Sequence, residues 1–205
     1  MENNVNYQTM IDKKKNPNKE FNSTLSFLLV LLAVVVIVTI VFTQIFNGVV
    51  VWGDSMNNTL IDGDYLYMQV NYTKIEHGDI IVLDSGEKLA NGETKYLIKR
   101  VIALPGDSIY AENGKLYRKE KGESEFKLIV EDYLPEKWTD KCNIASKTSP
   151  LTLEQNAIFF MGDNRNNSED SRGHYNTLTC SHVVGIVTPW SISCKGFLTK
   201  LFNLF

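Results

Sequence analysis

The stretch of the chain that says most about its fold is YLIKRVIAL, residues 96–104. Its branched and aliphatic side chains are typical of a β-strand that is buried within a sheet. Two cations, Lys99 and Arg100, interrupt the run, and successive side chains of a strand point to opposite faces. One of the two must therefore point into the protein. Burial disfavours a charged ammonium and lowers the pKa of a lysine, so a buried Lys99 would be able to accept a proton.

Similar short apolar segments occur on both sides of this stretch, separated by turns such as Asp62-Gly63-Asp64 and by the hairpin sequence Asn113-Gly114. Closely spaced strands with few helical patterns predict a mostly β domain, with a coiled or barrel-like sheet. We expect the further strands at residues 49–52, 65–70, 79–83, 107–111, 115–118, 157–161 and 183–187.

Residues 25–46 are almost entirely apolar and carry no charge. About twenty such residues cross a bilayer as a helix. The many valines and isoleucines would suit a strand in water, but a lipid environment requires backbone hydrogen bonds within the segment. A cleavable signal peptide is the alternative, and it would have a shorter apolar region followed by small residues. Residues 43–48 contain no such cleavage site, so the sequence predicts a permanent, single transmembrane anchor.

The charges on either side of residues 25–46 differ in sign. Lysines at positions 13, 14, 15 and 19 precede the span, and the first charged residue after it is Asp54. Positive flanks stay on the cytoplasmic side of a membrane. We therefore expect a polar cytoplasmic tail at residues 1–24, disordered over residues 1–20, and an extracytoplasmic domain at residues 47–205.

Composition excludes several classes of function. The 205 residues allow one domain plus the anchor, and 43% hydrophobic residues suffice for a core. The net charge of −3 argues against nucleic acid as a partner, because phosphate binding needs a basic face. We expect neither metal nor cofactor, since the histidines are scattered and no Cys-x-x-Cys occurs. Cys180 and Cys194 could form a disulfide, or all three cysteines could be free thiols.

Two further dense blocks lie on either side of residues 96–104. They are GDSMNNTL, residues 53–60, and GDNRNNSEDSR, residues 162–172. A serine hydroxyl is a weak nucleophile that needs a nearby base. Two of the three histidines lie outside the blocks, and His174 only follows the last one. A neutral, buried Lys99 is a base that could take the proton of a serine hydroxyl.

Together with the sequence Lys99–Asp107, the two blocks resemble those of the bacterial type I signal peptidases. These are membrane-bound Ser-Lys proteases that remove signal peptides from exported proteins. The resemblance covers residues 25–190 and implies a β-rich catalytic domain with a variable second lobe at about 105–155. It implies that Ser55 is the nucleophile, that Lys99 is the general base and that Met56 binds substrate.

The resemblance also implies supporting roles within the third block. The hydroxyl of Ser168 would bond the Lys99 amine and orient it, and Arg100 would be structural. Four charged residues would form ion pairs that hold the block beside Lys99, namely Asp163, Arg165, Asp170 and Arg172.

Two residues near Ser55 depart from the family pattern. Gly53 stands where some members have a hydroxyl that helps to bind the oxyanion, which leaves the Ser55 backbone N–H as one candidate donor. Asn58 stands where proline is usual, so the turn is less rigid. These departures leave the range of substrates open.

We therefore expect a monomeric serine endopeptidase that cleaves signal peptides from exported preproteins at the surface of the lipid bilayer, with small residues at the first and third positions before the cleaved bond. A peptidase dedicated to one pilin or secreted protein is an alternative, as is a non-catalytic membrane-tethered relative. A self-cleaving repressor-type protein shares the Ser-Lys chemistry but would be soluble and carry DNA-binding helices. The apolar tail at residues 197–205 either packs on the domain or enters lipid.

Overall fold

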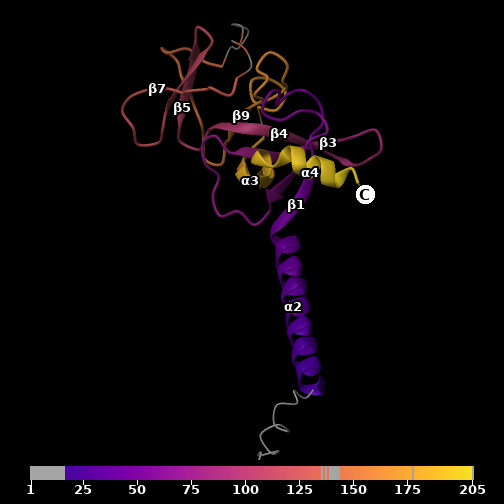
Figure 1. Ribbon diagram of the computed structural model, residues 1–205. Coiled ribbons are helices and arrows are strands. Elements are labelled where there is room, and N and C mark those ends of the chain that lie inside the picture. The colour runs from indigo at the N-terminus through magenta and orange to yellow at the C-terminus, as the bar shows by residue number, and fades with distance from the viewer. Residues whose placement is uncertain (1–16, 135, 137, 139–143, 177, 205) are drawn as a thin grey trace, which may run out of the picture. The chain divides into compact units, whose positions relative to one another are not determined.

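The computed structural model of the chain describes residues 17–134, 136, 138, 144–176 and 178–204 (Figure 1). It divides into two compact units between Gln44 and Ile45. The first unit contains α2 (Pro17–Ile45), which begins eight residues before the expected start of the span at Leu25. Most of the polar residues expected in the cytoplasmic tail lie outside the described residues.

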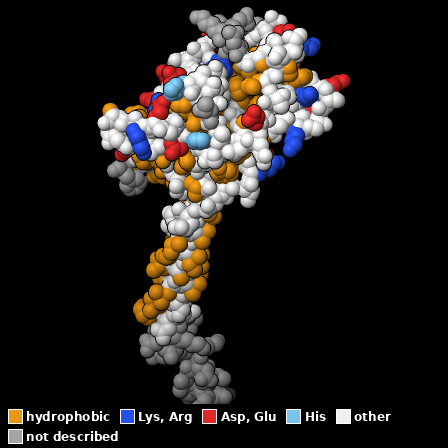
Figure 2. Space-filling view, turned by 180° about the vertical axis from the view of Figure 1, so that it is seen from behind, with side chains coloured by type: hydrophobic (Ala, Val, Ile, Leu, Met, Phe, Trp, Pro, Cys, Tyr) orange, Lys and Arg blue, Asp and Glu red, His pale blue; other side chains and the backbone are white. Residues whose placement is uncertain are grey.

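Within α2, Phe21–Ile45 is long and apolar enough to cross a membrane. Its side chains are exposed, so they are not the core of a soluble bundle. Figure 2 shows apolar side chains along this helix, whereas acidic and basic groups gather on the strand-rich unit. This distribution is what a lipid environment requires of a spanning helix.

The second unit contains two antiparallel sheets. The first has six strands in the order β1-β2-β10-β3-β4-β9. Its strands are β1 (Phe46–Val50), β2 (Tyr65–Gln69), β3 (Ile80–Lys88), β4 (Thr94–Ala103), β9 (Phe159–Met161) and β10 (Val183–Val187). The stretch YLIKRVIAL, residues 96–104, supplies most of β4, which lies between β3 and β9.

The second sheet has four strands in the order β7-β6-β5-β8. All four lie within the region expected to form a variable lobe. Asn113 and Gly114 join β5 to β6 with φ values of 52° and 68°, the positive values that a tight two-residue hairpin requires. The strands are β5 (Ser108–Glu112), β6 (Lys115–Lys119), β7 (Lys127–Leu128) and β8 (Leu151–Thr152).

The predicted mostly β fold is confirmed, but the barrel-like closure is not. The first sheet ends at β1 and β9, and these edges do not pair with each other in the described part of the chain. Strand β4 holds the parts together instead, because it contributes to three apolar clusters. Val101 packs in the cluster around Phe160, Ala103 packs in the cluster beside the second sheet, and Ile98 packs against the cluster under the β1–β2 loop.

Short helices complete the unit, and the sequence analysis did not predict them. They are a 3₁₀ turn at Cys180–His182, α3 (Pro189–Ser193) and α4 (Lys195–Phe202). Figure 1 shows α3 and α4 in yellow against the first sheet, where both contact β2. The apolar tail therefore packs on the domain through one of its faces.

Candidate active site

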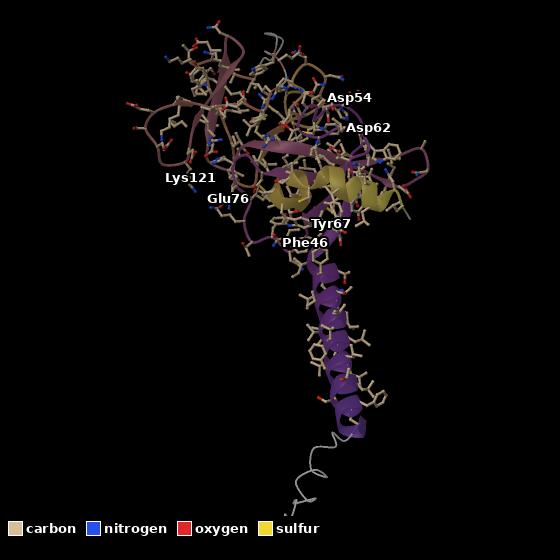
Figure 3. All side chains as sticks on the ribbon, viewed as in Figure 1. Phe46, Asp54, Asp62, Tyr67, Glu76 and Lys121 are labelled. Carbon is tan, nitrogen blue, oxygen red and sulfur yellow. The ribbon has the colours of Figure 1, made fainter. Side chains whose placement is uncertain are left out.

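The loop between β1 and β2 carries Ser55. Its two ends are joined by backbone hydrogen bonds, since the Val51 N–H donates to the carbonyl of Asp64 over 2.9 Å. Inside the loop, the Gly53 N–H donates to Asp62 Oδ1 over 2.7 Å. Figure 3 labels Asp54 and Asp62 on this loop. The polar bonds within the loop fix the turn that presents Ser55.

Strand β4 places Lys99 against this serine. Lys99 Nζ lies 2.8 Å from Ser55 Oγ and donates to the carbonyl of Ile98 over 3.0 Å. Only 4% of the residue is exposed. This burial lowers the pKa of Lys99 to about 8, although the nearby carboxylates of Asp170, Glu169 and Asp163 act in the opposite direction. A substantial fraction of the amine is therefore neutral near pH 8, and that form can accept the serine proton.

The neighbouring Arg100 points to the other face of β4 and binds Asp163 with two hydrogen bonds. The distances are 2.8 Å from Arg100 Nε to Oδ1 and 2.6 Å from Nη2 to Oδ2. Asp163 is fully buried and also accepts the hydroxyl of Thr59 over 2.6 Å. One carboxylate thus connects β4, the Ser55 loop and the third sequence block.

The third block docks on the Ser55 turn through its backbone. The Asn164 N–H donates to the carbonyl of Ser55, and its side-chain amide donates to the carbonyl of Asp54, each over 3.0 Å. Gly162 permits this approach, because a Cβ atom there would overlap both the Ser55 carbonyl oxygen and Ser168 Oγ. The sequence analysis did not identify Asn164 as a contact of the nucleophile turn.

The other charged residues of the block form two separate pairs. Asp170 binds Arg172 through both carboxylate oxygens at 2.8 Å and also accepts the Gly162 N–H. Arg165 pairs with Glu131 at 2.6 Å, a partner from outside the block. The predicted ion pairs therefore exist, but one of them reaches into the loop after β7.

That loop also supplies Tyr133, which the sequence analysis did not assign. The guanidinium of Arg100 lies 4.0 Å from the centre of its ring, and Arg165 donates to its hydroxyl over 3.2 Å. Burial raises the pKa of the Tyr133 hydroxyl, so it stays neutral between the two arginines. Polar, irregular residues such as 131–133 give no periodic pattern in sequence, so the contacts of Tyr133 with the two arginines could not be predicted.

Two predicted site residues lie differently from expectation. Ser168 Oγ is buried but forms no hydrogen bond with any described residue, so the expected bond to the Lys99 amine is not made here. Met56 was expected to bind substrate, yet it is only 1% exposed and packs with Val51, Leu60 and Leu66. A long apolar side chain that follows an exposed turn gains more by entering the core.

The Ser55 backbone N–H gives no hydrogen bond to any other described residue. It is therefore available as a donor to a developing oxyanion. Gly53, at φ +78°, has open space where a side chain would begin, so no hydroxyl assists from that position. Cys180 and Cys194 are both free thiols, and Cys142 lies outside the described residues.

A cavity of about 360 Å³ has Arg100 in its lining. Its lining includes His77, Arg118 and Tyr133, but neither Ser55 nor Lys99. Ser55 and Lys99 therefore do not belong to this cavity.

Comparison with known proteins gives the family of the chain. The family described as "Signal peptidase, peptidase S26" matches residues 24–191. The chain belongs to this family. It is similar to signal peptidase I P of Bacillus subtilis subsp. natto, with 32% identity over 86% of this chain and 92% of the relative. It is also similar to signal peptidase I S of Bacillus subtilis strain 168, with 31% identity over 84% of this chain and 91% of the relative.

Among solved structures, signal peptidase I of Enterococcus faecalis V583 aligns with a TM-score of 0.42 and 25% identity, over 58% of this chain and all of that chain. The family match and the Bacillus relatives show that the chain is a serine peptidase, and cleavage of signal peptides is the activity of its family. The family is membrane-associated, in keeping with the apolar helix Phe21–Ile45.

Proposed function

We propose that this chain cleaves the signal peptides of exported preproteins with Ser55 as nucleophile and Lys99 as general base. The observation that carries the proposal is the 2.8 Å separation of Lys99 Nζ from Ser55 Oγ, combined with the burial of Lys99. A base must lie within hydrogen-bond reach of the proton it abstracts and have a pKa near the working pH. Lys99 meets both conditions.

The chemistry is acyl transfer in two steps. The neutral Lys99 amine takes the Ser55 proton while Oγ attacks the carbonyl carbon before the cleaved bond. The resulting ammonium then gives that proton to the leaving amine, and an ester joins Ser55 to the signal peptide. Water hydrolyses the ester with Lys99 again as base. The free Ser55 N–H stabilises the oxyanion in both steps.

The edge of β4 next to the dyad offers a place for an extended substrate. The backbone N–H and carbonyl of Val101 point toward the β3 side, where they bond the carbonyl of Asp79 and the N–H of Gly78. Backbone groups alternate in direction along a strand, so the N–H and carbonyl of Ile98 point to the opposite edge of β4. On that edge β9 pairs with Arg100 and ends at Met161, so it does not reach Ile98. A substrate strand added there would bring its carbonyl to Ser55.

The proposed setting is the extracytoplasmic face of the cell membrane, with Phe21–Ile45 as the anchor and the N-terminus in the cytoplasm. The apolar helix and the lysines that precede it support this orientation. The substrates are then preproteins held in the same bilayer. The proposal includes both a general and a dedicated peptidase, and the precursors that accumulate uncleaved when the protein is depleted distinguish the two.

The test uses the full-length chain in detergent with a preprotein that has alanine at the first and third positions before the cleaved bond. We expect cleavage by the wild type and by Ser193→Ala, whose serine is exposed in α3, and none by Ser55→Ala or Lys99→Ala. A preprotein with phenylalanine at the first position should resist cleavage. Efficient cleavage by purified Lys99→Ala, or equal cleavage of both preproteins, would contradict the proposal.

A further inference from the structure

One aromatic ring from outside the first sheet contacts the face of β4 that Arg100 occupies. Tyr133 lies in the loop after β7, and the guanidinium of Arg100 lies 4.0 Å from the centre of its ring. An aromatic face attracts a guanidinium, and the attraction is stronger where water is excluded. The Arg100 side chain is only 13% exposed. The ring of Tyr133 therefore holds Arg100 by a contact that is largely shielded from water.

The orientation of this ring is fixed through its hydroxyl. Tyr133 donates to Glu131 Oε1 over 3.0 Å and accepts from Arg165 Nη2 over 3.2 Å. Glu131 and Arg165 also bind each other at 2.6 Å, and both side chains are buried. Charge-assisted bonds of this kind are the strong ones. The ring is thus set over Arg100 by a buried ion pair.

Arg100 connects this contact to the groups that carry the proposed reaction. Its two hydrogen bonds neutralise the carboxylate of Asp163. The same carboxylate accepts the hydroxyl of Thr59, which lies in the loop that carries Ser55. Because Asp163 is fully buried, its charge acts on its neighbours with little screening by water.

The charge of Asp163 also acts on the Lys99 amine. Burial lowers the pKa of Lys99 to about 8 and Lys95 acts in the same direction, whereas Asp170, Glu169 and Asp163 act in the opposite direction. A carboxylate that is paired with a guanidinium raises the pKa of a nearby ammonium less than an unpaired one does. The bonds between the guanidinium and Asp163 therefore help to keep the amine neutral near pH 8.

There is room for water beside the ring. The cavity of about 360 Å³ has both Arg100 and Tyr133 in its lining, together with the apolar Ile129 and Val130. A smaller side chain at position 133 would extend this cavity toward the guanidinium. Water that enters there would compete with Asp163 for the N–H groups of the arginine.

We propose that Tyr133 is a positioning residue, because its ring keeps Arg100 on Asp163. In this way it maintains the surroundings in which Lys99 acts as a base. The inference deepens the proposed function and rests on it. It also gives the second lobe a part in the reaction, although the four strands of that lobe belong to the other sheet.

The test is the pH dependence of kcat/KM for the full-length chain in detergent, measured from pH 6 to 11 with a preprotein substrate. Tyr133→Leu removes the aromatic face, and Tyr133→Phe keeps this face without the hydroxyl. Tyr117→Leu is the matched control, because Tyr117 is a half-buried tyrosine of β6 whose ring stacks on that of Tyr110.

We expect the midpoint to rise by about 0.5 pH unit or more in Tyr133→Leu, because a less well neutralised Asp163 favours the ammonium form of Lys99. At pH 7 this shift lowers kcat/KM by about threefold. Tyr133→Phe and Tyr117→Leu should keep the wild-type midpoint near 8.

The two ways of failing are distinct. A lower kcat/KM at every pH with an unchanged midpoint in Tyr133→Leu would show that the ring only supports the fold, and would overturn the inference alone. A wild-type midpoint far from 8 would overturn the proposed Lys99 base, and the inference with it.

A graded series covers the case in which Tyr133→Leu does not fold. Phenylalanines with one, two or three ring fluorines at position 133 keep the shape of the ring and withdraw charge from its face, so they weaken the attraction for Arg100 in steps. We expect the midpoint to rise with each added fluorine. The same midpoint across the series would overturn the inference.

Discussion

Two lysines on strand β4, four residues apart, have opposite electrostatic surroundings. Lys95 is partly exposed, and its ammonium binds Glu87 at 2.9 Å and the hydroxyl of Tyr175 at 2.8 Å. These hydrogen bonds raise the pKa of Lys95. Lys99 is buried, has a hydroxyl and a carbonyl as its partners, and has a pKa lowered to about 8. The strand supplies the same residue twice, and burial without a paired carboxylate makes only one of them a base.

The surroundings of Lys95 are a cluster on the surface. Glu87 binds Lys95, His174 and Tyr175. These bonds, with the one to Lys95 the largest cause, lower the pKa of Glu87 to about 2. This cluster ties the end of the β3–β4 hairpin to the segment after the third block. Its ion pairs are open to water, so each contributes little to stability.

The largest expected effect comes from removing each lysine in turn. Lys99→Met should lower kcat/KM by about 10³-fold or more, because the nucleophile then has no base. Lys95→Met should leave kcat/KM close to the wild-type value. Since Ser55 and Lys99 act as a unit, the double variant Ser55→Ala, Lys99→Met should be little worse than either single variant. If Lys95→Met lost as much kcat/KM as Lys99→Met, the claim that only Lys99 acts as a base would be contradicted.

The next effect concerns the buried ion pair beside Lys99. Asp163→Asn leaves Arg100 without its partner, and breaking a buried pair costs about 3–5 kcal/mol of stability. Thermal unfolding in detergent should show a markedly lower Tm. Glu87→Gln, in the exposed cluster at the other end of the strand, is the matched control and should hardly change Tm. Equal Tm values for the two variants would refute the connecting role of Asp163.

Stability should depend on pH in opposite ways through the two lysines. Between pH 8 and 10.5 the unfolded chain keeps the Lys99 proton that the folded chain has lost, so the free energy of unfolding rises with pH through this group. The difference amounts to about 3 kcal/mol at most. The raised pKa of Lys95 means that its contribution is present at neutral pH and is lost as the pH rises through its folded pKa.

Unfolding of Lys99→Met and Lys95→Met at pH 7.5 and 10.5 would measure these contributions. Lys99→Met should be more stable than the wild type at pH 7.5, and its advantage should shrink at pH 10.5. Lys95→Met should be less stable at pH 7.5. An advantage of Lys99→Met that grows with pH would show that the pKa of Lys99 is not lowered.

The smallest expected effect is at Ser168. The family resemblance predicts that Ser168→Ala slows cleavage by about 10- to 100-fold, less than the loss of Lys99, because the hydroxyl would turn to the Lys99 amine during the reaction and orient it without reacting. Its Oγ has no hydrogen-bond partner among the residues that the structure describes, and a buried hydroxyl without one is costly. If Ser168 positions Lys99, Ser168→Ala should lower kcat more than it raises KM. It should also shift the midpoint of the pH dependence of kcat. Unchanged kinetics would remove Ser168 from the site.

Sequence alone was sufficient for most of the strands, although not for β7 and β8, and it placed Lys99 on a strand from which it reaches Ser55. Alternating apolar residues and Asn113-Gly114 placed the β5–β6 hairpin, and the parity of Lys99 and Arg100 correctly required that one of them be buried. These features are local, so their spacing along the chain is enough to reveal them.

What sequence missed depends on contacts between distant segments. Glu131 and Tyr133 bind arginines from other strands and loops, and nothing in their own neighbourhood predicts this. Met56 enters the core for reasons of packing that the motif around Ser55 does not contain. The short helix α4 has apolar residues both against β2, at Phe202, and on its exposed side, at Phe197 and Leu201, so apolar spacing did not reveal the helix or its inner face.

The most direct test of the account is the pH dependence of kcat/KM for the full-length chain, measured from pH 6 to 11 with a preprotein substrate and with Lys95→Met alongside. Only the neutral Lys99 amine accepts the serine proton, so activity should rise with pH. The account predicts a midpoint near 8 in the wild type and in Lys95→Met, as the lowered pKa of Lys99 requires. A midpoint near 10.5, the ordinary value for a lysine, or no rise at all would contradict the buried Lys99 base.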